Sequence, residues 1–476
     1  MPRIPVRRGL PFLAAGLITV GAFAAGNATR ADGPVAGATK PGAAKTRVDK
    51  NRYPFGVPQG RPVQPPPPPG EPTLAPAYAT KTTTRLWGAD PYQKAVSVTQ
   101  HVWPAARPLN HKGEIDNVPD RPWGVTLVTP DDPLAAISAT PLIHFPNDAP
   151  ILYVSRHGVP QVTLNEIKRL GDTGIERHGD VDAFLVGAAA NPEVKRQLAA
   201  IGVKFTSVTG RDVYSLADNI DKLYGSIENP DTGVPQMGIS ASSGGNGMQN
   251  VMIGATNAWQ YVLPATHWVS HMPTGLLWVD RNRVPDATID ALKRRGMHGT
   301  IYVFGGPDQV SPAVVKQLAE YGAVSRVTSD DGVLFNAPPK NTPVNTAVAF
   351  AKMYDPMGMV GWGITGPGHG FTLVNRHDWQ SAVASAPLSH LGFHAPLLLT
   401  DSPSKLPKEV DRYFRSVAPR FLNSPAEGPY NMTFVMGSWT DITWRIQTDI
   451  DFVSEMINGR AWNSSDGGRY SDSGQP

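Results

Sequence analysis

The sequence contains no cysteine among its 476 residues. It therefore has no disulfide scaffold, no thiolate metal site and no cysteine that could carry a lipid anchor. Charged residues make up only 17% of the chain, the net charge is +3, and no dense run of lysine and arginine occurs. This charge pattern excludes an obvious nucleic-acid partner. The chain also lacks a Gly-x-Ser-x-Gly elbow, a His-Glu-x-x-His motif and an EF-hand loop, which are signatures of common enzyme and calcium sites.

The N-terminus has the pattern of an export signal. Three arginines among the first eight residues precede an apolar stretch of about 16 residues, which is short for a membrane span. We expect a signal peptide over residues 1–32, with an uncleaved anchor as the alternative, and no membrane span after cleavage. Residues 33–80 contain "RPVQPPPPPGEPTLAP", whose prolines favour an extended linker. Residues 458–476 are predicted to be a polar tail.

Three stretches of the body repeat one pattern. Each has a short apolar run, a glycine turn and an amphipathic helix, as in "DAFLVGAAANPEVKRQLAAIG" and "GTIYVFGGPDQVSPAVVKQLAEYG". Continuous apolar strands that alternate with helices are typical of parallel sheets covered on both faces. The sequence therefore predicts an α/β fold of three Rossmann-like βα units with mainly parallel sheets, at residues 81–203, 204–322 and 323–457.

The first two units open with a shared Gly-x-Asp-x-Tyr, in "TRLWGADPYQKAV" and "TSVTGRDVYSLAD". Together with "DPLAAISATPL", "APILYV" and "APLLLTDS", this pattern resembles the cell wall-binding repeat type 2 family of bacterial surface proteins, over residues 84–456. The resemblance implies three tandem repeats packed around a pseudo-threefold axis. It also implies non-covalent attachment to an anionic wall polymer. The second unit departs from the pattern, because Ala255 stands where the other units have Asp132 and Asp378.

The function implied by the resemblance is that of an exported, non-catalytic protein of the cell surface or cell wall that binds an anionic wall polymer or glycan. A self-associating structural or adhesive surface protein is the alternative. A metal-dependent hydrolase is a further alternative, disfavoured because no acid–base constellation accompanies the histidines.

Ligand-binding candidates come from the opening motifs, because guanidinium groups beside glycine turns suit a phosphate-bearing glycan. The candidates are Arg85, Asp90, Arg211, Asp212 and Arg326. An ion pair within the motif, Arg85 with Asp90 for instance, is the alternative use of these charges.

Histidines recur 123 residues apart in "PLIHFPNDAP", "PATHWVSHMP" and "PLSHLGFHAP", as His144, His267 and His390. Four positions after each of them stand Asp148, His271 and His394. Around a pseudo-threefold axis these residues would form two rings, and three imidazoles are the ligand set of an open tetrahedral zinc site. Two alternatives stay open: core histidines bonded to carbonyl groups, and histidines that contact a polar ligand.

Overall fold

The computed structural model describes most of the body of the chain, namely residues 77–103, 121–145, 147–171, 174–175, 178–225, 250–295, 299–327, 341–390, 393–421, 423–424, 426 and 428–458. The predicted signal peptide, most of the predicted linker and nearly all of the predicted tail lie outside the described residues. Everything described belongs to one unit of the chain, Val57–Pro476. Within that described part, no helix is both long and apolar enough to cross a membrane.

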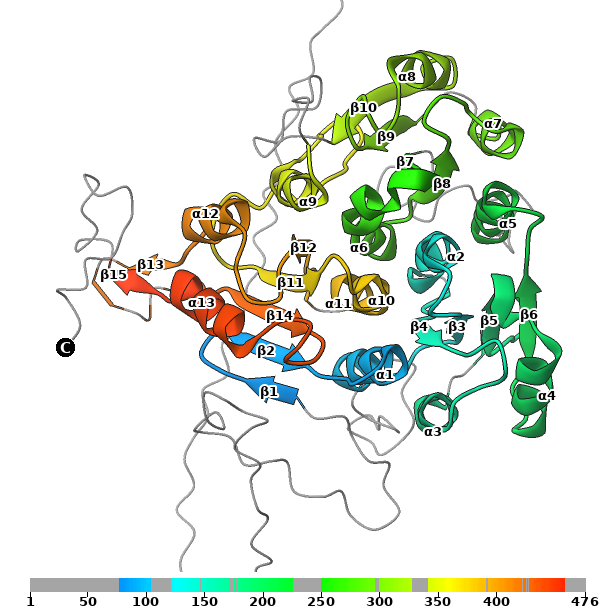
Figure 1. The fold of residues 1–476 in the computed structure, drawn as a ribbon, viewed down its shortest axis with the longest axis horizontal. Coiled ribbons are helices and arrows are strands. Elements are labelled where there is room, and N and C mark those ends of the chain that lie inside the picture. The colour runs from blue at the N-terminus through cyan, green and yellow to red at the C-terminus, as the bar shows by residue number, and fades with distance from the viewer. Residues whose placement is uncertain are drawn as a thin grey trace, which may run out of the picture. The chain divides into compact units, whose positions relative to one another are not determined.

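Three sheets form the framework of this unit (Figure 1). The first sheet has the order β4-β3-β5-β6 and consists of β3 (Val125–Val128), β4 (Ile151–Tyr153), β5 (Ala183–Val186) and β6 (Phe205–Val208). The second sheet has the order β8-β7-β9-β10 and consists of β7 (Val251–Ala255), β8 (Gly275–Val279), β9 (Thr300–Phe304) and β10 (Ala323–Val327). The strands of both sheets are parallel.

The third sheet has the order β1-β2-β14-β11-β12. It consists of β1 (Ala77–Ala79), β2 (Thr83–Leu86), β11 (Gly370–Asn375), β12 (Leu397–Thr400) and β14 (Met432–Met436). Only β1 is antiparallel to its neighbour. A separate two-stranded ladder pairs β13 (Arg420–Phe421) with β15 (Ile457–Asn458). The predicted α/β class with parallel sheets is confirmed.

Helices connect the strands and cover the sheets. Those after the opening strands of the predicted repeats are α1 (Pro91–Val102), α5 (Val213–Gly225) and α9 (Pro343–Lys352). The connections from β3 to β4, from β7 to β8 and from β11 to β12 contain α2 (Pro133–Ser138), η1 (Thr140–Ile143), η6 (Thr256–Val262), α6 (Leu263–His271), α10 (Trp379–Ala384) and α11 (Pro387–His390). The later connections are α3 (Gln161–Leu170), η3 (Gly187–Ala189), α4 (Pro192–Ala200), α7 (Asp286–Lys293), α8 (Pro312–Leu318), α12 (Lys408–Ser416) and α13 (Trp444–Ser454).

Local sequence signals explain where many of these elements begin. The parallel strands are short apolar runs such as "VTLV" and "LLLT", and every residue of β3, β5 and β12 is buried, as expected where helices cover both faces. Several helices begin after a side chain that accepts a bond from a free backbone N–H of the first turn. These caps are Asp90, Asp132, Asn191, Ser311, Thr342 and Asp378.

In each sheet, one edge strand of the parallel strands is the opening strand of another predicted repeat. β6 opens the second predicted repeat but pairs with β5, and β10 opens the third but pairs with β9. The third sheet is completed by β2, from the beginning of the body, with Thr83 opposite Thr433. The repeat limits at 203/204 and 322/323 thus separate strands that share a sheet. The domain limits and the pseudo-threefold axis stay predictions.

Helices from all three predicted repeats pack against one another between the sheets. α6 contacts α11, α10 and η1, and α1 contacts α10 and α11 (Figure 1). Hydrogen bonds join the layers: the Trp278 indole N–H donates to the Ser138 hydroxyl (2.7 Å), and the Tyr153 hydroxyl donates to the Gln380 carbonyl (2.8 Å). This packing brings the ends of η1, α6 and α11, with their histidines, into one region.

Candidate functional site

Arg85 lies in the core and not on a binding surface. It is 0% exposed, and its guanidinium donates to the carbonyls of Gly437 (3.0 Å), Ser438 (3.1 Å) and Ile442 (2.7 Å). A further bond runs from Nε to the side chain of Gln447 (3.0 Å). Burial lowers the pKa of Arg85 to about 9, although the charge of Asp441 opposes this shift. The predicted contact of Arg85 with a polymer is therefore corrected: this side chain connects β2 to the turn after β14.

Arg326 has the same role at the edge of the second sheet. It is half-buried on β10 and donates to the carbonyls of Gly305 (2.9 Å) and Val310 (2.6 Å), in the turn after β9. Burial lowers the pKa of Arg326. The repeated arginine thus holds the glycine turn of the neighbouring strand in two of the three sheets, and Ser207 occupies the position in β6.

The Gly-x-Asp-x-Tyr motif shapes the start of a helix. A Cβ on Gly88 would stand 2.4 Å from the Lys94 nitrogen, and one on Gly210 would stand 2.3 Å from the Leu216 nitrogen, so only glycine fits. Asp90 accepts from the Gln93 N–H (2.8 Å) and Asp212 accepts from the Ser215 N–H (2.7 Å). Both predicted ligand carboxylates are helix caps in this structure, and Arg85 bonds to backbone carbonyls and Gln447 instead of Asp90.

A buried charge cluster was missed by the sequence analysis. The Lys94 ammonium of α1 lies 2.7 Å from the carboxylate of Asp378 and 2.8 Å from that of Asp441, and Lys94 is 6% exposed. Burial lowers the pKa of Lys94, but the two carboxylates outweigh it and the pKa is raised. The cluster joins the first helix to the loops after β11 and β14, at the carboxyl edge of the third sheet.

His267 is a core residue. It is 0% exposed, its Nδ1 lies 2.9 Å from the Ala395 carbonyl and 2.6 Å from the Ser389 hydroxyl, and its Nε2 lies 3.1 Å from the Ser385 hydroxyl. Burial lowers its pKa to about 4. Both ring nitrogens are therefore satisfied by groups of the third predicted repeat, as in the core alternative.

The other predicted histidines gather near one another. The rings of His144 and His390 lie 5.4 Å apart, and His390 Nε2 contacts the carboxylate of Asp148. His144 Nδ1 donates to the Phe145 carbonyl (2.7 Å), to which the Tyr224 hydroxyl also donates (3.0 Å). Burial, together with the nearby His390, lowers the pKa of His144 to about 4.

His271 and His394 face each other across two predicted repeats. Their Nδ1 atoms are 3.2 Å apart and their ring centres are 4.8 Å apart. His271 stacks on Trp362, with ring centres 5.0 Å apart and planes inclined by 20°. Burial lowers the pKa of His271 to about 3, with further lowering by the neighbouring His394, His144 and His390.

The histidines thus form pairs and not two separate rings of three. The structure brings His144 near His390 and His271 near His394, and leaves His267 in separate bonds. Within the described residues, no group of three or more His, Asp or Glu side chains is placed to hold one metal ion. The predicted zinc site on a threefold axis stays a prediction.

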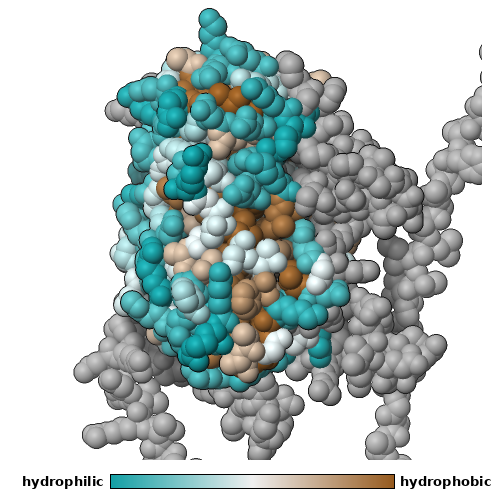
Figure 2. Space-filling model, turned by 90° about the vertical axis from the view of Figure 1, so that its right-hand side faces the viewer, coloured by the Kyte–Doolittle hydropathy of each residue, from teal (hydrophilic) through white to brown (hydrophobic). Residues whose placement is uncertain are grey.

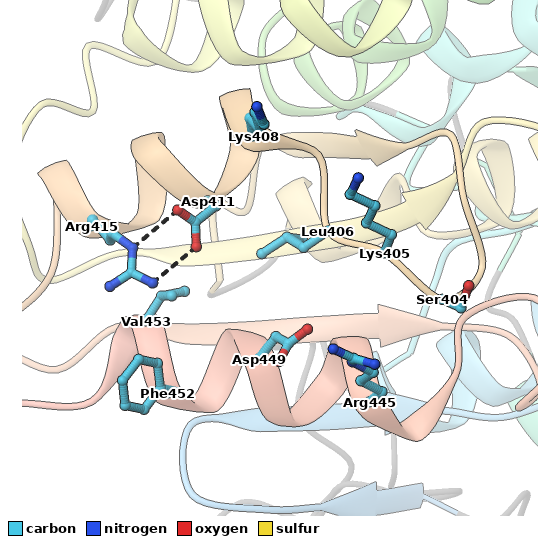
Figure 3. A pocket seen from close by; sticks show the side chains of 10 residues that line it. All are labelled: Ser404, Lys405, Leu406, Lys408, Asp411, Arg415, Arg445, Asp449, Phe452 and Val453. Carbon is cyan, nitrogen blue, oxygen red and sulfur yellow. Dashed lines mark hydrogen bonds and ion pairs between the residues drawn. The ribbon is translucent and has the colours of Figure 1, made fainter. Parts of the chain in front are cut away.

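A groove of about 280 Å³ lies between α12 and α13 (Figure 3). Its lining residues are Ser404, Lys405, Leu406, Lys408, Asp411, Arg415, Arg445, Asp449, Phe452 and Val453. Arg415 and Asp411 form a two-bond ion pair of 3.0 and 3.1 Å. Burial raises the pKa of Asp449; the charge of Arg445 opposes this shift, and the charge of Asp411 adds to it. Phe452 is 49% exposed, with the Arg415 guanidinium 5.7 Å from its ring centre.

Three cations of the groove make no hydrogen bond or ion pair with a described side chain, although Arg445 interacts electrostatically with Asp449. No hydrogen bond or ion pair within that part of the chain holds the charged ends of Lys405, Lys408 and Arg445. The first turns of α12 and α13 also have no side-chain cap. Sequence reasoning missed this groove because its two helices are far apart in the chain and only the fold makes them neighbours.

Arg211 borders a second, wider groove of about 630 Å³ between α5 and α7. Its charged lining is mixed: Arg211, Lys222, Asp218, Asp286 and Asp290. Asp218 is held by Lys222 (2.6 Å) and Arg294 (2.5 Å). Figure 2 shows the side of the molecule where α5 and α7 lie, and hydrophilic residues surround a central band of apolar ones. Of the predicted ligand residues, Arg211 is the exposed cation that lines a groove.

Comparison with solved structures finds the same fold in two bacterial proteins. Cwp6 from Clostridium difficile matches with a TM-score of 0.56 and 15% identity, over 80% of this chain and 49% of that one. Cwp8 from Clostridium difficile matches with a TM-score of 0.54 and 17% identity, over 78% and 52%. The shared feature is the fold. This chain spans about half the length of each. No family model matches the sequence, and no curated protein matches it.

Proposed function

We propose that this is an exported, non-catalytic protein of the cell envelope that binds an anionic cell-wall polymer. Two observations support the envelope role: the repeat pattern that resembles the cell wall-binding repeat type 2 family, and the fold shared with Cwp6 and Cwp8. The observation that carries the binding role is the α12–α13 groove, with three cations that are not held by a hydrogen bond or ion pair among the described side chains.

The chemistry of the groove favours an anion. Four cations and two carboxylates line it, which leaves a net charge of +2. The Arg415–Asp411 pair is internally neutral, and Asp449 offsets part of the charge of Arg445. Lys405 and Lys408, together with Arg445, remain to meet an anionic group. Uncapped N–H groups at the starts of α12 and α13 add partial positive charge at the same edge of the sheet. The exposed Phe452 ring provides an apolar surface for the face of a sugar.

Cosedimentation with purified cell walls tests this function. The mature chain is mixed with walls before and after removal of their anionic polymers, at low and high salt. The variant K405E/K408E/R445E reverses the three cations, and K316E is the matched control on α8, where Lys316 is exposed. We expect salt-reversible binding that is lost on stripping, because exposed ionic contacts are screened by salt. The triple variant should bind at least about tenfold more weakly, since each exposed contact contributes up to about 1 kcal/mol.

Three other outcomes of the cosedimentation would lead to different conclusions. Equal binding of the triple variant and the K316E control would move the site away from the α12–α13 groove. Absence of binding to either wall preparation would contradict the proposed function. Sedimentation of the protein without walls would favour the self-associating surface protein.

A further inference from the structure

The facing nitrogens of His271 and His394 have the spacing of two ligands on one metal ion. Their Nδ1 atoms are 3.2 Å apart. Two imidazole nitrogens, each about 2.0–2.1 Å from one ion, are separated by about 2.9 Å at a right angle and about 3.4 Å at the tetrahedral angle. The observed separation lies between these values. A metal ion could therefore replace the single N–H···N hydrogen bond at this separation of the nitrogens, once the rings turn their lone pairs toward the ion.

The ring of His271 is held in place before any ion binds. It stacks on Trp362 and meets the edge of Trp268, with ring centres 5.0 and 5.6 Å away. The backbone of Ser389 also acts on the ring and opposes the lowering of its pKa. The low pKa of His271, caused mainly by burial, keeps the imidazole neutral, which is the form that binds metals.

His394 supplies the accessible side of the pair. It is exposed and has a φ of +47°. His144 and His390 lie close enough to influence the charge of His271, and Asp148 contacts His390. Because no third described side chain joins the pair in a three-ligand group, water molecules would fill the other coordination positions.

We propose that His271 and His394 bind one first-row divalent metal ion, such as Zn²⁺, between the second and third predicted repeats. His271 ends α6, and His394 lies between α11 and β12. A bound ion would therefore join two segments 123 residues apart in a chain that has no cysteine for a disulfide. The proposal differs from a threefold zinc site, since it uses two of the five predicted histidines and leaves His267 in the core.

Titration of the full mature chain, with any affinity tag removed, tests the site with Zn²⁺ alone. Isothermal calorimetry gives the stoichiometry, and melting curves with and without Zn²⁺ give the stabilisation. The variant H394N removes the exposed ligand, and asparagine tolerates the positive φ at this position. The variant H271F keeps a ring against Trp362 without a ligating nitrogen. The control H157A removes an exposed histidine outside the cluster.

We expect one Zn²⁺ per chain and a raised melting temperature in the unmodified protein and in H157A, both reversed by a chelator. H394N and H271F should lose both responses. In Cu²⁺ electron paramagnetic resonance, the signature of two coordinating nitrogens should fall to one in H394N. Unchanged Zn²⁺ binding in H394N, or no binding by the unmodified chain, would overturn the proposal and leave an ordinary hydrogen bond between two imidazoles.

Discussion

The guanidinium of Arg85 lies 4.1 Å from the centre of the Trp439 ring. Arg85 belongs to the second strand described in the chain, whereas Trp439 follows β14 in the last third. The cation is therefore enclosed between an aromatic ring and a series of backbone carbonyls, and it connects two parts of the chain that only the fold brings together. This arrangement explains why a residue predicted to bind a polymer is inaccessible to one.

Replacing Arg85 by alanine should destabilise the protein strongly. The change would leave the carbonyls of Gly437 and Ile442 without their donor in a buried place, and each such group costs about 1–3 kcal/mol. We expect a loss of at least about 3 kcal/mol in the free energy of unfolding, measured by urea denaturation. R326A should cost less, because Arg326 is only half-buried and makes two carbonyl bonds. A stable R85A variant that fails to bind walls would instead restore a ligand role for Arg85.

Lys94 should control the acid sensitivity of the third sheet. Burial raises the pKa of Asp441, but bonds and charge from Lys94 and bonds from Ser438 lower it below its ordinary value. Because the folded pKa is the lower one, this contribution is complete above about pH 4 and is lost as the pH falls through the folded pKa. K94M should cost about 3–5 kcal/mol at neutral pH and flatten the acid limb of the stability curve. An unchanged acid limb in K94M would show that other carboxylates determine it.

Asp132 and Asp378 cap helices at corresponding positions of two predicted repeats, but they should contribute differently to the free energy of unfolding. Asp132 accepts from the Ala135 N–H (3.0 Å), and its loss in D132A should cost about 1 kcal/mol. Asp378 occupies the corresponding position, but it also accepts from Ser381 Oγ (2.6 Å) and pairs with Lys94. D378A should therefore cost about 3 kcal/mol or more, since it breaks a buried ion pair. Equal losses in the two variants, measured by thermal unfolding, would show that the Lys94 pair adds nothing beyond the cap.

His267 should matter for folding and not for metal binding. H267A would remove a buried ring and its bonds to the hydroxyls of Ser385 and Ser389, at a cost of about 2–4 kcal/mol that comes mainly from the cavity, because both hydroxyls keep a backbone carbonyl as partner. The Zn²⁺ response of the folded variant should match that of the unmodified protein. Loss of Zn²⁺ binding in H267A, with the fold retained by circular dichroism, would return His267 to the metal site.

The fold could be predicted in large part from the sequence because its signals are local. The buried strands are continuous apolar runs, and the caps and glycine turns stand at repeated positions, as with Gly88 and Gly210. The sequence pattern could not predict which sheet each strand joins. It assigns β6 and β10 to the start of the next predicted repeat, whereas in the structure β6 pairs with β5 and β10 pairs with β9. Strand pairing depends on three-dimensional packing, which a local sequence pattern does not specify.

The candidate sites were less predictable. The histidine spacing predicted two rings of three residues, whereas the structure contains pairs, His271 with His394 and His144 with His390. The opening motif predicted that Arg85 and Asp90 bind a ligand. In the structure Arg85 is buried, and Asp90 caps a helix. No sequence motif predicted the α12–α13 groove. Lys405 and Arg445 line the same groove only because of the order of strands in the third sheet.

The closure of the third sheet by β2 has a consequence for how the protein is made. Thr83 emerges from the ribosome long before Thr433, its partner across the ladder. Until β14 arrives, β2 has no parallel neighbour and Arg85 has no carbonyls to bind. Loops of this length close slowly compared with local contacts. A chain that ends before β14 would therefore leave β2 without its parallel partner. The third sheet can be completed only after the whole body has been synthesised.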